Sequence, residues 1–517
     1  MNDAETMQRR LPLWRVLLAL ALFAAGYAVA NRYQLTHGVL YRWAAGDMAS
    51  AAANFGWLAL QGAALLAALW LLPTRWMTAA LALAFVSVLV NLGFGMTVAD
   101  TLDAGKLAWL LAETRQAGPA MGEFFGPLVL ALAQAVVATG LFWAARKVLA
   151  PRKGALALGL FALALPTLLG LIWLPAAGAA ERNVYSLALR VAAAEPPPAR
   201  AAVSIAPDTA GTPRHVVWIV DESIAYDPFA RLIAPRLAAL QPVDFGRAWA
   251  MGNCSAPANV ALRSGVAVDR AGPEMDLRAT PSIWAYAKKA GYRTLLVEAQ
   301  VDGPPQNLLL LPELALVDET LNMAGDMDTD RRVAGWLNGQ LKSGERSFTF
   351  VVLRGVHFQY RDHFPVGTVP TDAPPAEQYR AALTYSKRDF FETLLEGVDR
   401  ADVAIAYTSD HGQNIAPDTL PHCSRDGVRT EYEVPLLAFL SPERSAVYDD
   451  SPREGHSLSQ LFPETLVWMG YDRTAAEAAY DNGLTRGPRR YVRFGRGVVP
   501  LGAGDRVEVT VSETPEF

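Results

Sequence analysis

The 517-residue chain is poor in cysteine, in histidine and in charged residues. Its two cysteines, Cys254 and Cys423, are too few for a disulfide framework, although one bridge between them stays an open alternative in an oxidising compartment. The formal net charge is −5, so the basic surface typical of nucleic-acid-binding proteins is not expected. Charged residues make up 19% and hydrophobic residues 52% of the chain, which is a high apolar content for a soluble protein.

The apolar residues are concentrated in the first third of the chain. Five runs there are long enough to cross a bilayer core of roughly 30 Å; they cover residues 12–30, 51–72, 77–97, 125–145 and 155–175. One such run is also typical of a buried core helix, but five in succession with almost no internal charge favour membrane spans. The sequence therefore predicts a transmembrane domain of five helices over residues 1–178.

The distribution of lysine and arginine predicts the orientation of these spans. Arg9, Arg10 and Arg15 precede or enter the first span, Arg75 lies between the second and third, and "RKVLAPRK" (146–153) joins the fourth and fifth. Because basic loops stay in the cytoplasm, we expect a cytoplasmic N-terminus and an external C-terminal part. "AVAN" (28–31) resembles a signal-peptidase site; cleavage there would leave four spans and the same external C-terminal part.

Two regions of different composition follow the apolar spans. Residues 179–213 are rich in alanine and proline, and we interpret them as a linker. From 214 to 517, short apolar runs alternate with amphipathic helical patterns; the runs are "HVVWIVDES", "RTLLVEAQ", "FTFVVLRG", "VAIAYTSDHG" and "VPLLAFLSP". This alternation predicts an α/β domain with a mostly parallel sheet covered by helices on both faces.

Residues able to bind a metal follow these apolar runs. Ligands gather beyond the carboxyl ends of the strands in such a sheet. The candidates are Asp221 and Glu222 after the first run, His357 after the third, Asp410 and His411 after the fourth, and His422 in a later loop. Oxygen and imidazole donors together suit a divalent cation, zinc first and manganese second. The alternative for any single strand-end acid is a helix cap or a surface ion pair.

The segment "GNCSAPANVALRSG" (252–265) holds a candidate nucleophile. Pro257 is tolerated in the first turn of a helix, so a helix is expected to begin near Ser255. A serine there lies at the positive end of the helix dipole, beside backbone donors that bind phosphate. The alternative is that Ser255 is only an N-cap. A neighbouring metal site favours the nucleophile, because a bound cation promotes loss of the hydroxyl proton.

The order of these motifs resembles the alkaline phosphatase/sulfatase superfamily, in particular its membrane-anchored phosphoethanolamine and phosphoglycerol transferases. "SAPANVALRSG" is similar to the sulfatase-type nucleophile segment, and "DES" resembles the first metal-binding acid. "YTSDHG" is similar to the second metal motif, "GVHF" to a substrate-side histidine, and "PHC" followed by "EYEVPLLAFLSP" to the late histidine and its strand. The resemblance covers roughly residues 214–470.

This resemblance implies a role for each matching residue. Ser255 would be the nucleophile and would complete a metal site of Glu222, Asp410 and His411, with Asp221 as an additional ligand. His357, His422 and Asn259 would contact the substrate. The cofactor would be a divalent metal, zinc first and manganese or magnesium next.

The resemblance also implies a reaction and a location. Ser255 would take a phospholipid head group, phosphoethanolamine before phosphoglycerol, and pass it to an envelope lipid or glycan. The enzyme would lie in the bacterial inner membrane with its catalytic domain in the periplasm. Sulfatases carry arginine at the position of Asn259, where it serves formylglycine formation, and the transferases usually carry threonine at the position of Ser255. The alternatives are a sulfatase-like phosphodiesterase or sulfuric-ester hydrolase, and a non-catalytic lipid-binding membrane regulator.

Overall fold

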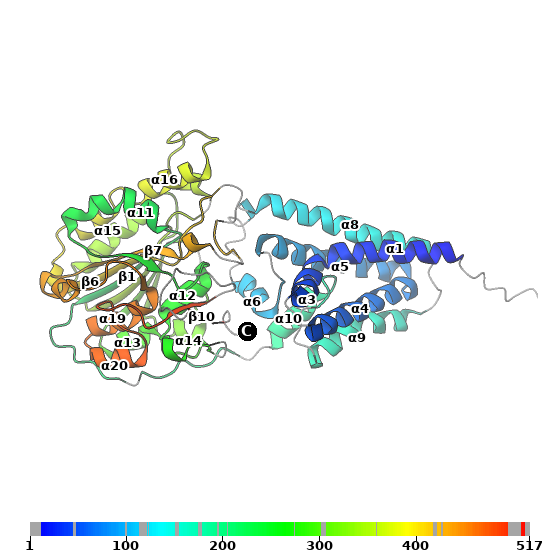
Figure 1. Ribbon diagram of the computed structural model, residues 1–517, viewed down its shortest axis with the longest axis horizontal. Coiled ribbons are helices and arrows are strands. Elements are labelled where there is room, and N and C mark those ends of the chain that lie inside the picture. The colour runs from blue at the N-terminus through cyan, green and yellow to red at the C-terminus, as the bar shows by residue number, and fades with distance from the viewer. Residues whose placement is uncertain are drawn as a thin grey trace, which may run out of the picture. The chain divides into compact units, whose positions relative to one another are not determined.

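The computed structural model describes residues 12–511 except 45–47, 99–100, 113–120, 123, 150–154, 174–177, 194–195, 204, 273–274, 301–306, 358, 417–420, 425–427 and 495–507. The chain divides into two compact units. The first contains the residues up to 194, and the second contains residues 195–517 together with the short stretch 112–119. Figure 1 shows a helical first unit and a second unit built on a sheet.

The first unit is a bundle of long apolar helices. Four of its described helices are long and apolar enough to cross a membrane: α1 (Leu13–Ala30), α4 (Met48–Leu71), α5 (Thr74–Val98) and α8 (Phe125–Leu149). The fifth expected span corresponds to α9 (Leu156–Trp173), whose apolar stretch Leu156–Gly170 is shorter. The expected apolar helices are therefore present, and four of them meet the length of a full span. The loop "RKVLAPRK" lies partly outside the described residues.

The stretch expected as a linker begins with ordered structure. Gln61 accepts a hydrogen bond from the Ala179 amide at 2.9 Å, and Asn31 accepts one from the Ala180 amide at 2.7 Å. Helix α10 (Asn183–Ala193) follows and buries Leu187 on its apolar side. The pattern "NVYSLALRVAA" is amphipathic, which is why this part of the stretch is a helix of the first unit rather than part of a linker.

The second unit contains an eight-stranded sheet in the order β4-β3-β5-β1-β6-β7-β2-β8. Its strands are β1 (His215–Asp221), β2 (Val243–Trp249), β3 (Arg293–Glu298), β4 (Glu319–Asn322), β5 (Ser347–Val352), β6 (Val403–Ser409), β7 (Glu433–Phe439) and β8 (His456–Ser457). β7 pairs antiparallel with both β6 and β2, and the other described pairs are parallel. The expected mostly parallel sheet is confirmed.

Helices cover both faces of this sheet (Figure 1). One face packs against α11 (Tyr226–Leu232), α15 (Thr329–Leu341), α16 (Pro375–Ser386) and α17 (Phe390–Leu395) in one buried apolar cluster. On the other face, Trp218 of β1 donates a hydrogen bond to Thr465 of α19 (Leu461–Trp468), and Phe350 of β5 packs on Trp284 of α13 (Ile283–Lys289). Both faces are thus covered by buried side chains, which leaves the strand ends as the exposed edge of the sheet.

Candidate active site

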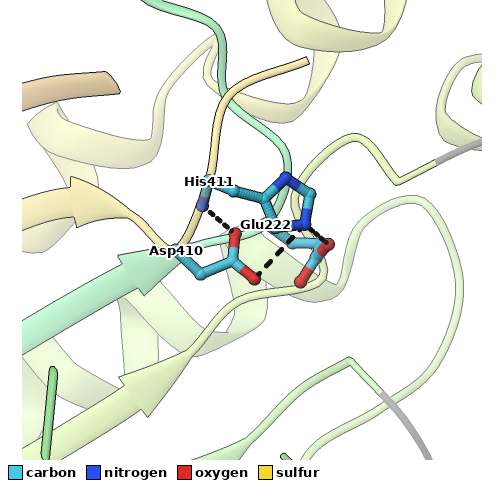
Figure 2. A group of neighbouring side chains, drawn as sticks. All are labelled: Glu222, Asp410 and His411. Carbon is cyan, nitrogen blue, oxygen red and sulfur yellow. Dashed lines mark hydrogen bonds and ion pairs between the residues drawn. The ribbon is translucent and has the colours of Figure 1, made fainter. Parts of the chain in front are cut away.

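Two neighbouring parallel strands place the acidic residues of the site. β1 and β6 pair in register, with Asp221 opposite Ser409. Glu222 directly follows β1, and Asp410 and His411 directly follow β6, so all three side chains emerge at the same carboxyl edge of the sheet (Figure 2). This is the edge at which α/β sheets bind their ligands.

Glu222, Asp410 and His411 form a compact group that is suited to a cation. Their potential ligand atoms lie within 4.8 Å of one another, and all three side chains are buried. His411 Nε2 is 3.4 Å from Glu222 Oε1 and 3.7 Å from Asp410 Oδ2. His411 Nδ1 lies 2.7 Å from the carbonyl oxygen of Gly412, the kind of contact that directs the other ring nitrogen to a metal. Among the described residues, no lysine or arginine forms an ion pair with either carboxylate.

The pKa values of this group reflect both its burial and the charges that its members place on one another. Burial and the charge of Glu222 raise the pKa of Asp410 well above its usual range. Burial opposes the charged form of His411, but the carboxylates of Asp410 and Glu222 outweigh it and raise the pKa of this imidazole to about 10. Two adjacent buried carboxylates are costly without compensating positive charge. Without a metal, the protonated His411 imidazole provides part of that charge. A divalent cation would supply it in full, and the donor set of two carboxylates and one imidazole fits such a cation.

Further groups hold the Glu222 carboxylate in place. Glu222 Oε1 accepts a hydrogen bond from Ser223 Oγ at 2.9 Å, and Glu222 Oε2 accepts one from Gln300 Nε2 at 2.7 Å. Gly355, at φ +58°, allows close contact with the backbone of Glu222, where a Cβ atom would clash with the Glu222 carbonyl. The sequence interpretation missed Gln300. Gln300 could have been found because it is a polar residue directly after the apolar run "RTLLVEA", which ends at the same edge of the sheet.

Ser255 lies beside this group. It is the first residue of α12 (Ser255–Arg263), and Cys254 occupies the N-cap position without a side-chain capping bond. The Ser255 hydroxyl donates to Glu222 Oε1 at 3.1 Å and lies 3.2 Å from His411 Nε2. The expected start of the helix is confirmed, and the alternative of a simple serine N-cap is wrong. The hydroxyl faces the group of Glu222, Asp410 and His411 instead of its own helix.

Asp221 belongs to a different cluster. Its Oδ2 forms an ion pair with Lys387 Nζ at 2.7 Å and accepts a hydrogen bond from Tyr407 at 2.5 Å. Lys387 also forms an ion pair with Asp330 at 2.9 Å, so this one buried ammonium group pairs with both carboxylates. Burial raises the pKa of Asp221 to about 6, against the opposing charge of Lys387. Asp221 was expected as an additional metal ligand; the structure instead directs its carboxylate to Lys387.

The structure brings both substrate-side histidines to this edge of the sheet. The rings of His411 and His422 are stacked with centroids 4.8 Å apart, and the rings of His422 and His357 are 5.1 Å apart. His422 and His357 are partly exposed, whereas His411 is buried. The three neighbouring rings thus connect the buried group of Glu222, Asp410 and His411 with two partly exposed positions.

Asn259 lies one helical turn after Ser255 and faces the group of Glu222, Asp410 and His411. Its Nδ2 donates to the Ser255 carbonyl at 3.0 Å and to Asp410 Oδ2 at 3.4 Å. Its Oδ1 is buried without a hydrogen-bond partner among the described residues. This amide is therefore adjacent to both the expected nucleophile and an expected ligand.

The two cysteines form a disulfide across the site. Cys254 and Cys423 are bonded, with their Cα atoms 4.9 Å apart and a sequence separation of 169. This is the pairing that the composition left open.

A protein-family comparison identifies the second unit. The model of the sulfatase family matches residues 214–471, a range that includes every site residue described above. Residues 214–471 are a sulfatase-family domain. No curated protein matches the chain in sequence.

A solved membrane-protein structure shows the same fold. The integral membrane lipooligosaccharide phosphoethanolamine transferase A (EptA) from Neisseria meningitidis aligns over 89% of this chain and 96% of its own, with 13% identity and a TM-score of 0.56. Two isolated domains also match: the C-terminal periplasmic domain of EcEptC from Escherichia coli, in complex with Zn (18% identity, 53% and 87% coverage, TM-score 0.44), and the soluble domain of the Neisseria transferase (15%, 54% and 94%, 0.44). The chain therefore resembles the full-length EptA structure over both its apolar helices and its sulfatase-family domain.

Proposed function

We propose that this chain is a metal-dependent phosphotransferase that moves a phospholipid head group to a lipid or glycan of the bacterial envelope. Phosphoethanolamine is the first candidate for the head group and phosphoglycerol the second. The reaction proceeds through a phosphorylated Ser255. The proposed site lies in the periplasm, and the apolar helices anchor it in the inner membrane.

One observation carries this proposal. The Ser255 hydroxyl stands at a helix N-terminus and contacts both Glu222 and His411, two members of a buried group with no lysine or arginine counter-ion among the described residues. A serine that only stabilised its helix would point back at the backbone amides. A hydroxyl that faces a cation site is arranged as an activated nucleophile.

Glu222, Asp410 and His411 would hold the metal, and Ser255 Oγ would complete the set. Zinc is the first choice because carboxylate, imidazole and alkoxide donors suit it, with manganese or magnesium as the next choices. When bound, the cation would supply Lewis acidity that favours the deprotonated serine. The helix N-terminus of α12 adds its own positive potential at the same atom.

The proposed transfer has two half-reactions: head-group transfer to Ser255, and then transfer from Ser255 to the acceptor. Ser255 Oγ attacks the phosphorus of the phospholipid; the Oγ–P bond forms, the bond from phosphorus to the glycerol oxygen breaks, and diacylglycerol leaves with a proton. His422 and His357 lie on the solvent side of His411, where they are candidates to donate that proton or to bind the phosphoryl oxygens. A hydroxyl or phosphate of the acceptor next attacks the phosphorus, and Ser255 is released.

A trapped intermediate tests this function. Purified protein incubated with phosphatidylethanolamine, without acceptor, should release one diacylglycerol per chain and carry a phosphoethanolamine group on the peptide containing Ser255. Mass spectrometry of the digested protein measures the adduct, and phosphatidylglycerol is the matched control for the head group.

Two other results of this experiment would contradict the proposed head-group transfer. Continuous release of free phosphoethanolamine without acceptor would indicate a hydrolase that uses water. Lipid binding with no diacylglycerol release, at full metal occupancy, would contradict any transfer and would favour a non-catalytic lipid-binding protein.

The orientation of the anchor gives a separate prediction. Because arginine and lysine gather at Arg75 and in residues 146–153, these loops should be cytoplasmic and the sulfatase-family domain external. A reporter enzyme that is active only in the periplasm should be active when fused after residue 200 and inactive when fused after residue 150. A cytoplasm-specific reporter at the same two positions is the reciprocal control, and the opposite pattern would place the domain away from its proposed lipid donor.

A further inference from the structure

The disulfide joins the two segments that carry Ser255 and His422. Cys254 directly precedes Ser255 and is the N-cap residue of α12, and Cys423 directly follows His422. The bond therefore connects the backbone of the proposed nucleophile to the backbone of a proposed substrate-side histidine. Since each cysteine is one residue from a site residue, the bond limits how far the two can separate.

Hydrogen bonds also hold the described residues on both sides of His422. The Asn414 amide donates to the Pro421 carbonyl at 2.6 Å, and the amide and hydroxyl of Ser424 donate to Glu431 at 3.2 and 2.6 Å. Residues 417–420 and 425–427, on either side of it, lie outside the described residues. Within the described part, the Cys423 amide donates to the Asn253 carbonyl at 2.8 Å, and Asn253 Nδ2 donates to the Ser424 carbonyl at 2.9 Å. Both of these hydrogen bonds involve the segment that also carries Cys254. The disulfide and its neighbours thus fasten the loop to the start of α12.

The backbone conformation of Cys423 also indicates that the loop is held in place by its surroundings. Its φ is +57°, in the left-handed region that residues other than glycine, asparagine and aspartate seldom adopt. Such a conformation persists only where the surrounding structure imposes it, and it occurs often at functional sites. Here it turns the chain between His422 and Ser424.

The His422 side chain has little to orient it apart from its backbone. Its Nδ1 is buried without a hydrogen-bond partner among the described residues. Its described neighbours are the rings of His411 and His357. Ring contacts of this kind do not define a position as a hydrogen bond does, so the placement of the imidazole follows the loop.

We propose that the Cys254–Cys423 disulfide is a positioning element of the active site, which holds His422 at the distance from Ser255 that the phosphoryl group requires. The proposal rests on the proposed function. It assigns the cysteines no chemical step: they act through His422. A misplacement of about 1 Å in a reacting group costs on the order of 10²-fold in rate.

A double-mutant cycle separates positioning from general stabilisation. The variant Cys254→Ala/Cys423→Ala should bind metal at wild-type stoichiometry and lose about 10²-fold in head-group transfer. In a His422→Ala background, the same two substitutions should cause no further loss, because the residue they position is gone. An equal loss in both backgrounds, or no loss in the wild-type background, would overturn the proposal.

Reduction of the wild-type protein provides a second route that needs no variant to fold. These are the two cysteines of the chain, so a reductant has no other disulfide in it to cleave. Treatment with a phosphine reductant should lower transfer by the same factor, and reoxidation should restore it. Unchanged turnover of fully reduced protein would contradict the proposal.

Chemical labelling distinguishes this proposal from the proposed function, since it uses no substrate. With metal bound, diethyl pyrocarbonate should modify His422 several-fold faster after reduction, as mass spectrometry of the digest would show. The buried His363 is the internal control and should stay unmodified in both states. Equal labelling of His422 before and after reduction would refute the positioning role even if transfer were confirmed; faster labelling would support it even if the reaction proved different.

Discussion

Replacing Ser255 by alanine is expected to abolish the phospho-enzyme and to lower head-group transfer by about 10⁴-fold or more, as loss of a nucleophile does in other covalent mechanisms. The side chain lost is the one whose oxygen contacts Glu222 and His411. The fold should persist, because Cys254 rather than Ser255 is the N-cap of α12. The stability cost should therefore fall below the range of about 0.5–2 kcal/mol that a lost N-cap causes. Transfer kinetics, adduct mass and thermal unfolding together measure these effects.

Ser255→Thr is the matched control for this experiment. It keeps a hydroxyl at the same helix position and should retain part of the transfer activity. Cys254 is unsuitable as a control because it forms the disulfide with Cys423. An alanine variant that still forms the phospho-enzyme, or a threonine variant as inactive as alanine with its metal bound, would argue against Ser255 as nucleophile.

Replacing Asp410 by alanine should remove the metal. The residue contributes a carboxylate to the buried group and accepts the His411 amide at 2.7 Å, so the variant loses a ligand and a support of the neighbouring ligand. Supporting residues alone typically change metal affinity by about 10–100-fold, and a ligand should change it by more. Metal per chain, measured by elemental analysis after dialysis, should fall from one to near zero while the helical unit stays folded.

Asp221→Asn tests the specificity of that loss. Asp221 is also a buried acid at the end of β1, but it pairs with Lys387. The asparagine variant should therefore lose stability and keep its metal, since Lys387 retains Asp330 as a partner. Stoichiometric metal in Asp410→Ala, or its loss in Asp221→Asn, would contradict the ligand set proposed here.

The sequence was sufficient to predict the sheet and the acids at its edge for a simple physical reason. Strands buried on both faces are continuous apolar runs, and the first polar residues after them must emerge at the strand ends. Glu222 and Asp410 were recognisable in this way, and the pairing of β1 with β6 brings them together. Pro257 likewise indicated the start of α12.

Other features depend on contacts between distant residues, which local patterns do not encode. Asp221 and Glu222 are adjacent acids in the sequence, and their roles separate because Asp221 contacts Lys387 and Tyr407 while Glu222 joins Asp410 and His411. The antiparallel direction of β7 and the approach of Gln300 to Glu222 are set by the arrangement of the whole sheet. The pairing of Cys254 with Cys423 was one of two outcomes that composition allowed.

The register between β1 and β6 links metal affinity to folding. Asp221 and Ser409 lie 188 residues apart in the chain, and the backbone carbonyl of the first accepts a hydrogen bond from the hydroxyl of the second. A shift of either strand by one residue would send the following ligands to opposite faces of the sheet. The unfolded chain therefore has no preformed set of donors, and a cation that binds only the native state adds its binding free energy to the stability of the domain. If the proposed metal binds, chelation would lower the melting temperature of the domain as well as its activity, and metal supply would determine the fraction of the chain that is folded.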